Sequence, residues 1–479
     1  MLAWTWALHV PFRAVEGSDD AFFLEIAHLW SQGVLPYIGA FDIKPPGLFA
    51  ILVAAESALG VGLQTIHAVS IAFDAVAATA LYFLGRRLGS DAIGVASALL
   101  YPFLSLFVTN NSAYPPLGAF TILAFLAALS PLPIARRALL AGLSIGLAST
   151  IKQTAAFEGV ALLAVFWRAP DAGRQRMKTA WLFAGAACLA PLVILLYFAA
   201  HGAAGALAQD VVANALLRPG SAIERVSFAE GVLRFFVYLT KPIEPLLVLA
   251  CLAFLRRRVI LAAAPDAPID ALFLWSAAAI LSAWAQHALF RAYLAPAFAP
   301  LALLANAVIV LAVPELKRIG APLRTVAVAV LTVASVLLVW KPDLDRVQDS
   351  EAIATAAQAI RATDPSPQDK LFVAGHGLSL YVATGLAPPT AYFHWEHTLC
   401  DFPGAGLARL AEALAAEPRY IVASARMRYR YERPESWKLV DAALSRSYRL
   451  IAHIPAKADF YDIYELVEAR SADFGRDEM

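Results

Sequence analysis

The sequence predicts a polytopic α-helical membrane protein with a small α/β domain at its C-terminal end. Of its 479 residues, 60% are hydrophobic and only 16% are charged, and the mean hydropathy is +0.64. A soluble domain of this length cannot bury so much apolar surface. Charged residues become more frequent after residue 340. We therefore expect a transmembrane domain over residues 1–340 and a soluble domain over residues 341–479.

Overall charge and cysteine content exclude two other classes of protein. The formal net charge of +1 gives no basic surface for nucleic acid, so we expect no nucleic-acid partner. The three cysteines are Cys188 and Cys251 in apolar runs and Cys400 in the polar C-terminal region. Their spacing indicates no disulfide framework.

Ten apolar runs approach the length of about 20 residues that crosses a bilayer. They lie near residues 65–85, 91–109, 115–131, 138–151, 153–167, 179–200, 231–255, 271–289, 292–313 and 322–340. The short pair over 138–167 predicts helices that are broken or that meet at the interface. Residues 1–12 are also apolar but reach only roughly 18 Å at about 1.5 Å per residue, so this helix is partial or begins further upstream. The expected total is about 11 transmembrane helices.

Basic residues predict the orientation of these helices, because short cytoplasmic loops accumulate Lys and Arg. They occur at every second boundary, as Arg86 and Arg87, Arg136 and Arg137, Arg168 to Lys178, Arg256 to Arg258, and Lys317 with Arg318. The alternation places on the outer face residues 13–64, 110–116, the region around 152, 201–230, 287–291 and everything after 340. The apolar run 46–60 must then lie along the membrane or re-enter it.

The same alternation gathers the unusual polar residues at the outer ends of the spans. They are Asp19, Asp20, Asp42, Lys44, Asn110, Asn111, Lys152, Gln153, His287 and Arg291. Ionisable groups at membrane depth are energetically expensive and usually face a cavity or a partner, so we expect one outward-facing site. The alternative is a set of ordinary interfacial residues whose ends reach water.

The first outer loop ends in the stretch GAFDIKPPGLFA, residues 39–50. Its two prolines prevent a helix from absorbing the end of the loop, which would hold Lys44 at the membrane surface. An ammonium group there suits a phosphate. Asp42 alternatively forms only a local ion pair with Lys44, which is worth little if exposed.

The region after residue 340 carries mixed helix and strand patterns. EAIATAAQAIRAT and LARLAEALAAEP predict amphipathic helices, KLFVAG and RYIVAS predict strands, and RLIAHIP with FYDIYELV predicts a closing hairpin. Alternating strands and helices favour a small α/β or α+β domain, which the topology places outside.

Several stretches resemble one enzyme family, the lipid-linked-sugar-dependent glycosyltransferases of the C fold (GT-C). The resemblance is to the bacterial branch related to protein O-mannosyltransferases and to the aminoarabinose transferase that modifies lipid A. The loop EGSDDAFFLEIAHLWSQGVLPYIGAFDIKPPGLFA carries it most specifically, with an acidic pair at the start and Asp-x-Lys-Pro-Pro-Gly at the end. GLASTIKQTA, LFRAYLAPAFAPLALLA and LFVAGHGLSLYVATGLAPPTAYF add weaker similarity. The chain departs from the pattern at Asp20, where Glu is usual, and at Phe22 and Phe23, where Tyr often stands.

The resemblance implies a multi-pass protein of the bacterial inner (plasma) membrane with a periplasmic C-terminal domain. It implies a polyprenyl-phosphate-sugar donor, membrane lipid around the protein, and a glycan, lipid or protein acceptor in the cell envelope. Inversion of the anomeric centre is expected, because a single displacement needs one base. The resemblance further implies Asp19 as the catalytic base or acceptor-orienting carboxylate, and Asp20 as its close support or as a metal ligand. It leaves open whether the reaction uses a divalent cation, Mg²⁺ or Mn²⁺. Ser18 and Asp19 also suit a helix N-cap, which is compatible with that role.

The chemistry independently suggests roles for the remaining polar residues. Fixed cations neutralise the charge on a departing phosphate; Lys44 is the first candidate, Lys152 and Arg291 follow, and His287 is a possible donor beside them. Asn110, Asn111 and Tyr114 lie on a short outer loop. They are candidates for contacts with the sugar, although polar turn residues are the simpler interpretation.

Two alternatives remain open at this point. His394, His397 and Cys400 have spacings that metal ligands adopt, and His376 stands nearby, but their aromatic neighbours favour a packed loop. As a whole, the protein is alternatively a lipid or glycan flippase or transporter. A transporter should carry polar groups near the midplane, whereas these gather at one face, so we favour the transferase. A glycan ligase or polymerase with the same donor chemistry is a closer competitor.

Overall fold

The computed structural model describes most of the chain in two compact units. The described residues are 1–10, 19–106, 112–169, 175–217, 227–286, 290–313, 320–339, 346–400, 404–424, 432–456 and 460–467. The first unit, the helical unit, comprises residues 1–28, 42–219 and 224–344. The second, the C-terminal unit, comprises residues 29–41, 220–223 and 345–479. A segment that the sequence analysis placed in the first outer loop, 29–41, thus packs with the C-terminal residues.

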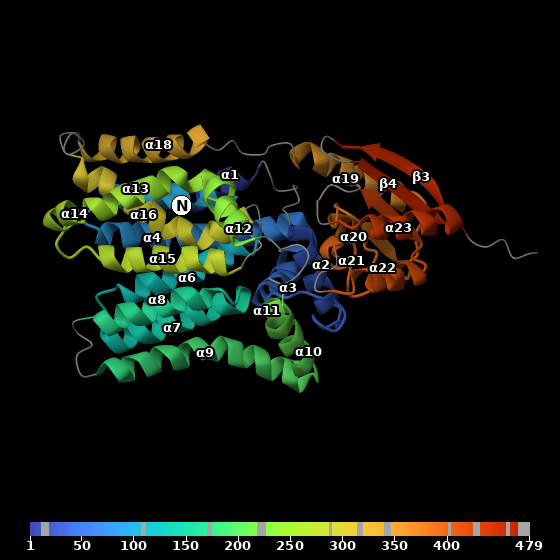
Figure 1. Ribbon diagram of the computed structural model, residues 1–479, viewed down its shortest axis with the longest axis horizontal. Helices are drawn as coiled ribbons and strands as arrows, with labels where there is room; N and C mark the ends of the chain where they lie inside the picture. Colours follow the sequence, from blue (N-terminus) through green and yellow to red (C-terminus); the bar gives the residue numbers. More distant parts are fainter. Residues whose placement is uncertain are drawn as a thin grey trace, which may run out of the picture. The chain divides into compact units, whose positions relative to one another are not determined.

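Mostly apolar helices of very different lengths make up the helical unit (Figure 1). They are α1 (Leu2–His9), α2 (Asp20–Ser31, which ends in the other unit), α3 (Gly47–Leu59), α4 (Leu63–Arg87), α5 (Asp91–Leu104), α6 (Tyr114–Ala128), α7 (Ile134–Ile151), α8 (Ala155–Arg168), α9 (Arg176–Ala200), α10 (Ala204–Ala208), α11 (Ala215–Leu217), α12 (Phe228–Arg234), α13 (Glu244–Leu255), α14 (Arg257–Ala263), α15 (Ile269–Ala285), α16 (Ala295–Ala312) and α18 (Ala321–Val339).

Each predicted apolar run overlaps at least one of these helices. Four of the described helical segments are long and apolar enough to cross a membrane, namely Leu63–Arg87, Ile134–Ile151, Arg176–Ala200 and Arg291–Ala312. Seven further apolar helical segments have 10–17 residues. The short pair predicted over 138–167 is broken as expected, because Lys152 is extended between α7 and α8.

One expected span was wrong as a single continuous helix. The run 231–255 divides into the end of α12, a π-helical turn over Phe235–Leu239, a 3-10 turn over Lys241–Ile243, and α13. Pro242 and Pro245 explain the division, since a proline lacks the N–H that continues a helix and is tolerated in its first turn.

Helix α16 lies in the interior of the helical unit. Almost every residue of α16 is buried, and Asn306 supplies its buried polar contacts. The Asn306 Nδ2 donates to Ser97 Oγ of α5 at 3.0 Å, and its Oδ1 accepts from Thr332 Oγ1 of α18 at 2.8 Å. These hydrogen bonds join three helices without leaving the amide unsatisfied.

Small residues let α7 and α9 pack closely. Gly142 and Gly146 lie four residues apart on α7, and a Cβ added at either would lie 2.4 Å from a carbonyl oxygen of α9, that of Phe183 or of Ala187. The spacing is that of the Gly-x-x-x-Gly pattern through which helix backbones approach one another in membranes.

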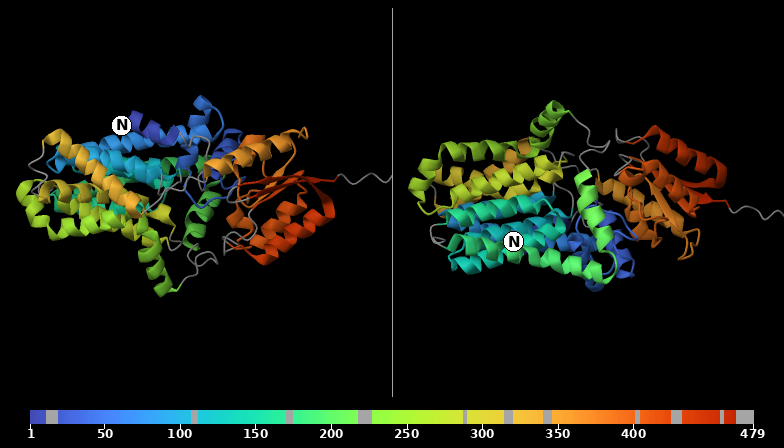
Figure 2. Two further views of the ribbon diagram at one scale, coloured as in Figure 1. Left: turned by 90° about the horizontal axis from the view of Figure 1, so that it is seen from above. Right: turned by 60° about the horizontal axis from the view of Figure 1, so that its bottom comes forward.

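The C-terminal unit is built on a four-stranded mixed sheet. Its strands are β1 (Leu371–Ala374), β2 (Tyr420–Ser424), β3 (Tyr448–Pro455) and β4 (Phe460–Leu466), in the order β1-β2-β4-β3. β1 and β2 are parallel, and β3 and β4 form the predicted antiparallel hairpin. Helices lie on both sides of the sheet (Figure 2). They are α19 (Arg346–Arg361), α20 (Ser379–Thr384), α21 (Trp395–Thr398), α22 (Gly406–Ala415) and α23 (Pro434–Ser447). The predicted small α/β domain is therefore confirmed.

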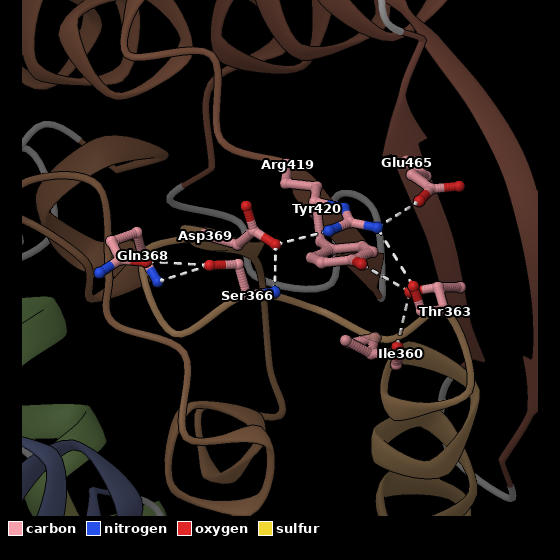
Figure 3. A network of polar contacts seen from close by, with 8 residues as sticks. All are labelled: Ile360, Thr363, Ser366, Gln368, Asp369, Arg419, Tyr420 and Glu465. Carbon is pink, nitrogen blue, oxygen red and sulfur yellow. Dashed lines mark hydrogen bonds and ion pairs between the residues drawn. The ribbon is translucent and has the colours of Figure 1, made fainter.

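A polar network around Arg419 ties this sheet together (Figure 3). The Arg419 guanidinium donates to Asp369 Oδ2 at 2.6 Å, to the Thr363 carbonyl at 3.1 Å and to Glu465 Oε1 at 3.3 Å. It thereby connects the start of β2 with the end of β4 and with the loop that follows α19. The network satisfies charges at the sheet edge and has a structural role.

The α7–α9 contact predicts that alanine substitution destabilises the protein at one glycine and not at another. Gly146→Ala places a methyl group against the Ala187 carbonyl and should destabilise the protein by about 1–3 kcal/mol through overpacking. Thermal unfolding in detergent measures the change. Gly185→Ala on the exposed face of α9, where an added Cβ meets nothing within 4 Å, is the matched control and should not destabilise the protein. Equal unfolding temperatures for the two variants would contradict the close packing.

Candidate functional site

The segment between α1 and α3 brings Asp19, Asp42 and Lys44 together in the helical unit. The Lys44 ammonium lies 3.9 Å from Asp19 Oδ2 and 3.5 Å from Asp42 Oδ1. It also lies 4.6 Å from the ring centroid of Phe23, within cation–π range. The side chains of Lys44 and Asp19 are 20% and 29% exposed, whereas that of Asp42 is 4% exposed. The site therefore presents one ammonium and one carboxylate to a ligand, with a second carboxylate behind them.

The turn that carries Lys44 is held by its own residues. Asp42 Oδ1 accepts the backbone N–H of Ile43 at 2.7 Å and that of Lys44 at 3.3 Å. Pro46 then caps α3, which begins at Gly47. A Cβ on Gly47 would lie 2.4 Å from Thr150 Oγ1, so only glycine permits this approach of α3 to α7. The short Asp-x-Lys-Pro-Pro-Gly element is thus a compact turn and helix start.

Burial raises the pKa of Asp42, and the charge of Lys44 together with the two backbone N–H groups opposes that shift. The charge of Lys44 therefore favours the ionised form of Asp42. Removing the lysine would leave a buried carboxylate without its main counter-charge. The two residues act as one electrostatic unit.

Asp19 occupies the N-cap position of α2. Its carbonyl accepts the N–H of Phe23 at 3.0 Å, which is the first hydrogen bond of that helix, while its carboxylate lies beside Lys44. The structure thus supports the helix-start interpretation of Asp19 without removing its carboxylate from the site. Asp19 therefore begins the helix and also keeps its carboxylate beside Lys44.

Asp20 differs from its neighbour. Its side chain is buried, with 2% exposed, and its Oδ1 accepts the backbone N–H of Ser112 at 2.8 Å. Burial raises the pKa of Asp20, and the Ser112 N–H opposes the shift. Asp20 therefore anchors the segment before α6. Its buried carboxylate does not stand beside that of Asp19 as a second accessible carboxylate.

This arrangement does not fit a divalent cation held by Asp19 and Asp20. Mg²⁺ prefers about six oxygen ligands in octahedral geometry, whereas Asp19 faces an ammonium and Asp20 is engaged with a backbone N–H. Over the described residues, no group of three or more His, Cys, Asp or Glu side chains is placed to hold a metal.

Lys152 belongs to a second cluster of the helical unit. Its ammonium donates to Tyr114 Oη at 2.6 Å and lies 4.0 Å from the ring centroid of Tyr293. Only 8% of Lys152 is exposed. Tyr114, expected to contact a sugar, thus contacts the second candidate phosphate cation. Tyr114 also lines an apolar pocket with Trp275 and Pro296.

Gln153 links two backbone segments and received no role from the sequence. Its Nε2 donates to the Ile43 carbonyl at 2.7 Å and to the Val211 carbonyl at 2.8 Å. Val211 lies in a π-helical turn, Gln209–Asn214. One side-chain amide therefore fixes the residue before Lys44. The adjacency of Gln153 to Lys152 was visible in the sequence, but its target was not.

Arg291 begins a 3-10 turn, Arg291–Leu294, that also carries Tyr293. Asn110, Asn111 and His287 lie outside the described residues.

The histidines of the C-terminal unit form an aromatic cluster. His394 Nδ1 accepts the N–H of Glu396 and caps α21. The His397 ring packs edge-on against Phe41 with centroids 4.7 Å apart. Cys400 is buried, which raises its pKa. These contacts favour the packed-loop interpretation over a metal site.

Comparisons with known proteins give a match to one family model over part of the chain and similarity to two solved structures of one protein. Residues 43–198 match the model of the dolichyl-phosphate-mannose-protein mannosyltransferase family. A crystal structure of ArnT from Cupriavidus metallidurans bound to undecaprenyl phosphate is similar, with a TM-score of 0.60 and 13% identity over 98% of this chain and 97% of that one. The apo structure of the same protein gives a TM-score of 0.58 and 15% identity over 96% of each chain. No curated protein sequence matches the chain. The family match and the shared fold confirm the predicted resemblance to GT-C glycosyltransferases.

Proposed function

We propose that this protein is a membrane glycosyltransferase that moves a sugar from a polyprenyl-phosphate donor to an acceptor of the cell envelope. The observation that carries the proposal is the Lys44 ammonium held beside the Asp19 carboxylate, on a fold similar to that of a protein solved with undecaprenyl phosphate. A base and a phosphate-binding cation side by side are what this transfer requires.

The reaction is a single displacement at the anomeric carbon. The acceptor hydroxyl oxygen attacks that carbon, the bond from carbon to the phosphate oxygen breaks, and the anomeric centre inverts. The proton of the hydroxyl passes to Asp19, acting as general base. The polyprenyl phosphate leaves with one more negative charge, which Lys44 stabilises. Asp42 keeps the ammonium in place from behind and takes no proton.

The other polar groups have supporting roles in this proposal. Lys152, held by Tyr114 and Tyr293, adds positive potential, and Arg291 is a further phosphate contact. His287, Asn110 and Asn111 stay candidates for the donor and sugar contacts. The transferase occupies residues 1–340 in the bacterial inner membrane, and residues 341–479 form a periplasmic domain. The acceptor is a glycan, lipid or protein.

A donor panel tests the proposal. Purified protein in lipid vesicles is incubated with radiolabelled polyprenyl-phosphate sugars and a crude envelope fraction. We expect one labelled sugar to move to the acceptor. If labelled lipid crosses the bilayer of sealed vesicles and no sugar is transferred, the glycosyltransferase proposal is overturned in favour of a flippase or transporter.

Asp19→Asn should lower the transfer rate by about 10²–10⁴-fold, which is the typical contribution of a general base. The amide keeps the shape of the side chain but cannot accept the proton. Rates are measured with the labelled donor at saturating concentration. Binding of undecaprenyl phosphate to this variant should persist, and a rate within about twofold of wild type would remove Asp19 from the mechanism.

Lys44→Ala should weaken undecaprenyl-phosphate binding and lower kcat by about 10²–10³-fold, the usual loss when one stabilising group of a transition state is removed. Isothermal titration and initial rates measure the two effects. Lys241→Ala, at the 3-10 turn Lys241–Ile243, is a lysine control. Unchanged binding and rate in Lys44→Ala would contradict the phosphate role.

Gln153→Glu should lower kcat/KM by about tenfold, since small misplacements of a catalytic group have effects of this order or larger. A carboxylate cannot donate to the Ile43 and Val211 carbonyls and would repel them. Gln286→Glu is the matched control, because the side-chain amide of Gln286 donates to the Ser282 carbonyl one turn earlier in its own helix. Equal kinetics for the two variants would show that Gln153 does not position the turn.

A further inference from the structure

The residues just before the Lys44 turn are built into the C-terminal unit. Phe41 is 2% exposed, and its ring lies 4.7 Å from that of His397 and 5.1 Å from that of Tyr392, centroid to centroid. Its backbone N–H donates to the Ala391 carbonyl at 2.9 Å. An aromatic side chain from the first loop thus packs in the core of the C-terminal unit, against residues that lie some 350 positions later in the chain.

A cation closes this aromatic cluster. The Arg409 guanidinium, on α22, lies 3.9 Å from the ring centroid of Tyr392 and 5.6 Å from that of Phe41. Both distances are within cation–π range. Three kinds of contact therefore hold Phe41: packing against two aromatic rings, a backbone hydrogen bond and a nearby cation. We call Phe41, Tyr392, His397 and Arg409 the Phe41 anchor.

The chain leaves the anchor directly into the proposed site. Asp42, the next residue, belongs to the helical unit and accepts the N–H groups of Ile43 and Lys44. Three residues reach at most about 11 Å when fully extended, so the position of Phe41 limits the position of Lys44. The far side of the turn is tied to the helical unit through Gln153.

We propose that the C-terminal domain positions the donor-phosphate lysine through the Phe41 anchor. Phe41 is a positioning residue: it touches no reacting atom and acts through Lys44. Loss of the anchor frees one end of the turn, so that ordering Lys44 on the phosphate then costs conformational entropy. The inference rests on the proposed function and gives the C-terminal domain a part in donor binding.

Binding of undecaprenyl phosphate to the full-length protein in detergent tests this inference, because it needs no identified sugar or acceptor. Phe41→Leu removes the ring from the anchor and should weaken binding about tenfold, within the usual range of coupling between sites. Phe372→Leu is the matched control, since Phe372 is fully buried in β1 of the same unit but is not part of the anchor. Both variants should lower the unfolding temperature, and only the first should weaken binding.

A double variant separates positioning from general damage. If Phe41 acts through Lys44, the combination of Phe41→Leu with Lys44→Ala should bind no more weakly than Lys44→Ala alone. Arg409→Met leaves the Phe41 side chain in place and should weaken binding in the same direction. Its effect is therefore measurable even where Phe41→Leu reduces the yield of folded protein.

The outcomes distinguish the two proposals. If Lys44→Ala weakens binding while Phe41→Leu and Arg409→Met bind like wild type, the anchor has no positioning role and the inference is overturned. Additive losses in the double variant would overturn it as well. If wild-type protein does not bind undecaprenyl phosphate, or binds it equally well without Lys44, the proposed function itself fails, and the inference fails with it.

Discussion

The positive charge of Lys44 is the constraint around which the proposed site is organised. A lysine at the end of an apolar helical bundle must keep its charge without losing all contact with water, since charged groups inside the hydrocarbon cost about 2.5 kcal/mol or more. Two carboxylates and the face of Phe23 surround the ammonium. Asp42 in turn depends on Lys44, because burial alone would raise the pKa of this carboxyl. The two opposite charges therefore stabilise each other.

The two lysines of the site differ in what they offer a ligand. Lys152 lies in a cage of Tyr114 and Tyr293 and is almost fully buried. Lys44 keeps a fifth of its side chain exposed. A phosphate that must arrive and leave needs an ammonium with accessible donors. Lys152 is better suited to shape the local potential and to order the tyrosines, so the two cations are not interchangeable in the proposed mechanism.

The sequence predicted the parts of this molecule that depend on short-range patterns. Apolar runs located the helices from α4 to α18, and alternating strand and helix patterns located the C-terminal sheet. The acidic start and Asp-x-Lys-Pro-Pro-Gly end of the first loop correctly identified residues that meet in space, Asp19, Asp42 and Lys44. The expected continuous helix over 231–255 failed because two prolines outweighed a long apolar run.

Short-range sequence patterns could not predict contacts between segments that are distant in the chain. Nothing near Gln153 in the sequence indicates that its amide reaches the carbonyls of Ile43 and Val211. Asp19 and Asp20 are identical neighbours in the sequence. At the start of α2, however, Asp20 faces Ser112 whereas Asp19 faces Lys44. Phe41 reads as one more apolar residue of a loop, because the rings that bury it lie some 350 residues away. Tertiary packing decides each of these roles.

The turn that carries Lys44 has no regular secondary structure of its own, so its precision must come from its attachments. Binding sites are usually most precise when rigid elements support them. Here Asp42 closes the turn locally, Gly47 lets α3 start against α7, and Gln153 fixes the Ile43 carbonyl. Gln153 lies in the α7–α8 break, and Thr150, which faces Gly47, lies in the last turn of α7. Polar residues at this point of an otherwise apolar helix pair therefore support the turn. The break between α7 and α8 leaves Lys152 in an extended conformation, with Gln153 directly after it. It therefore places the Gln153 amide against the Ile43 carbonyl and the Lys152 ammonium against Tyr114.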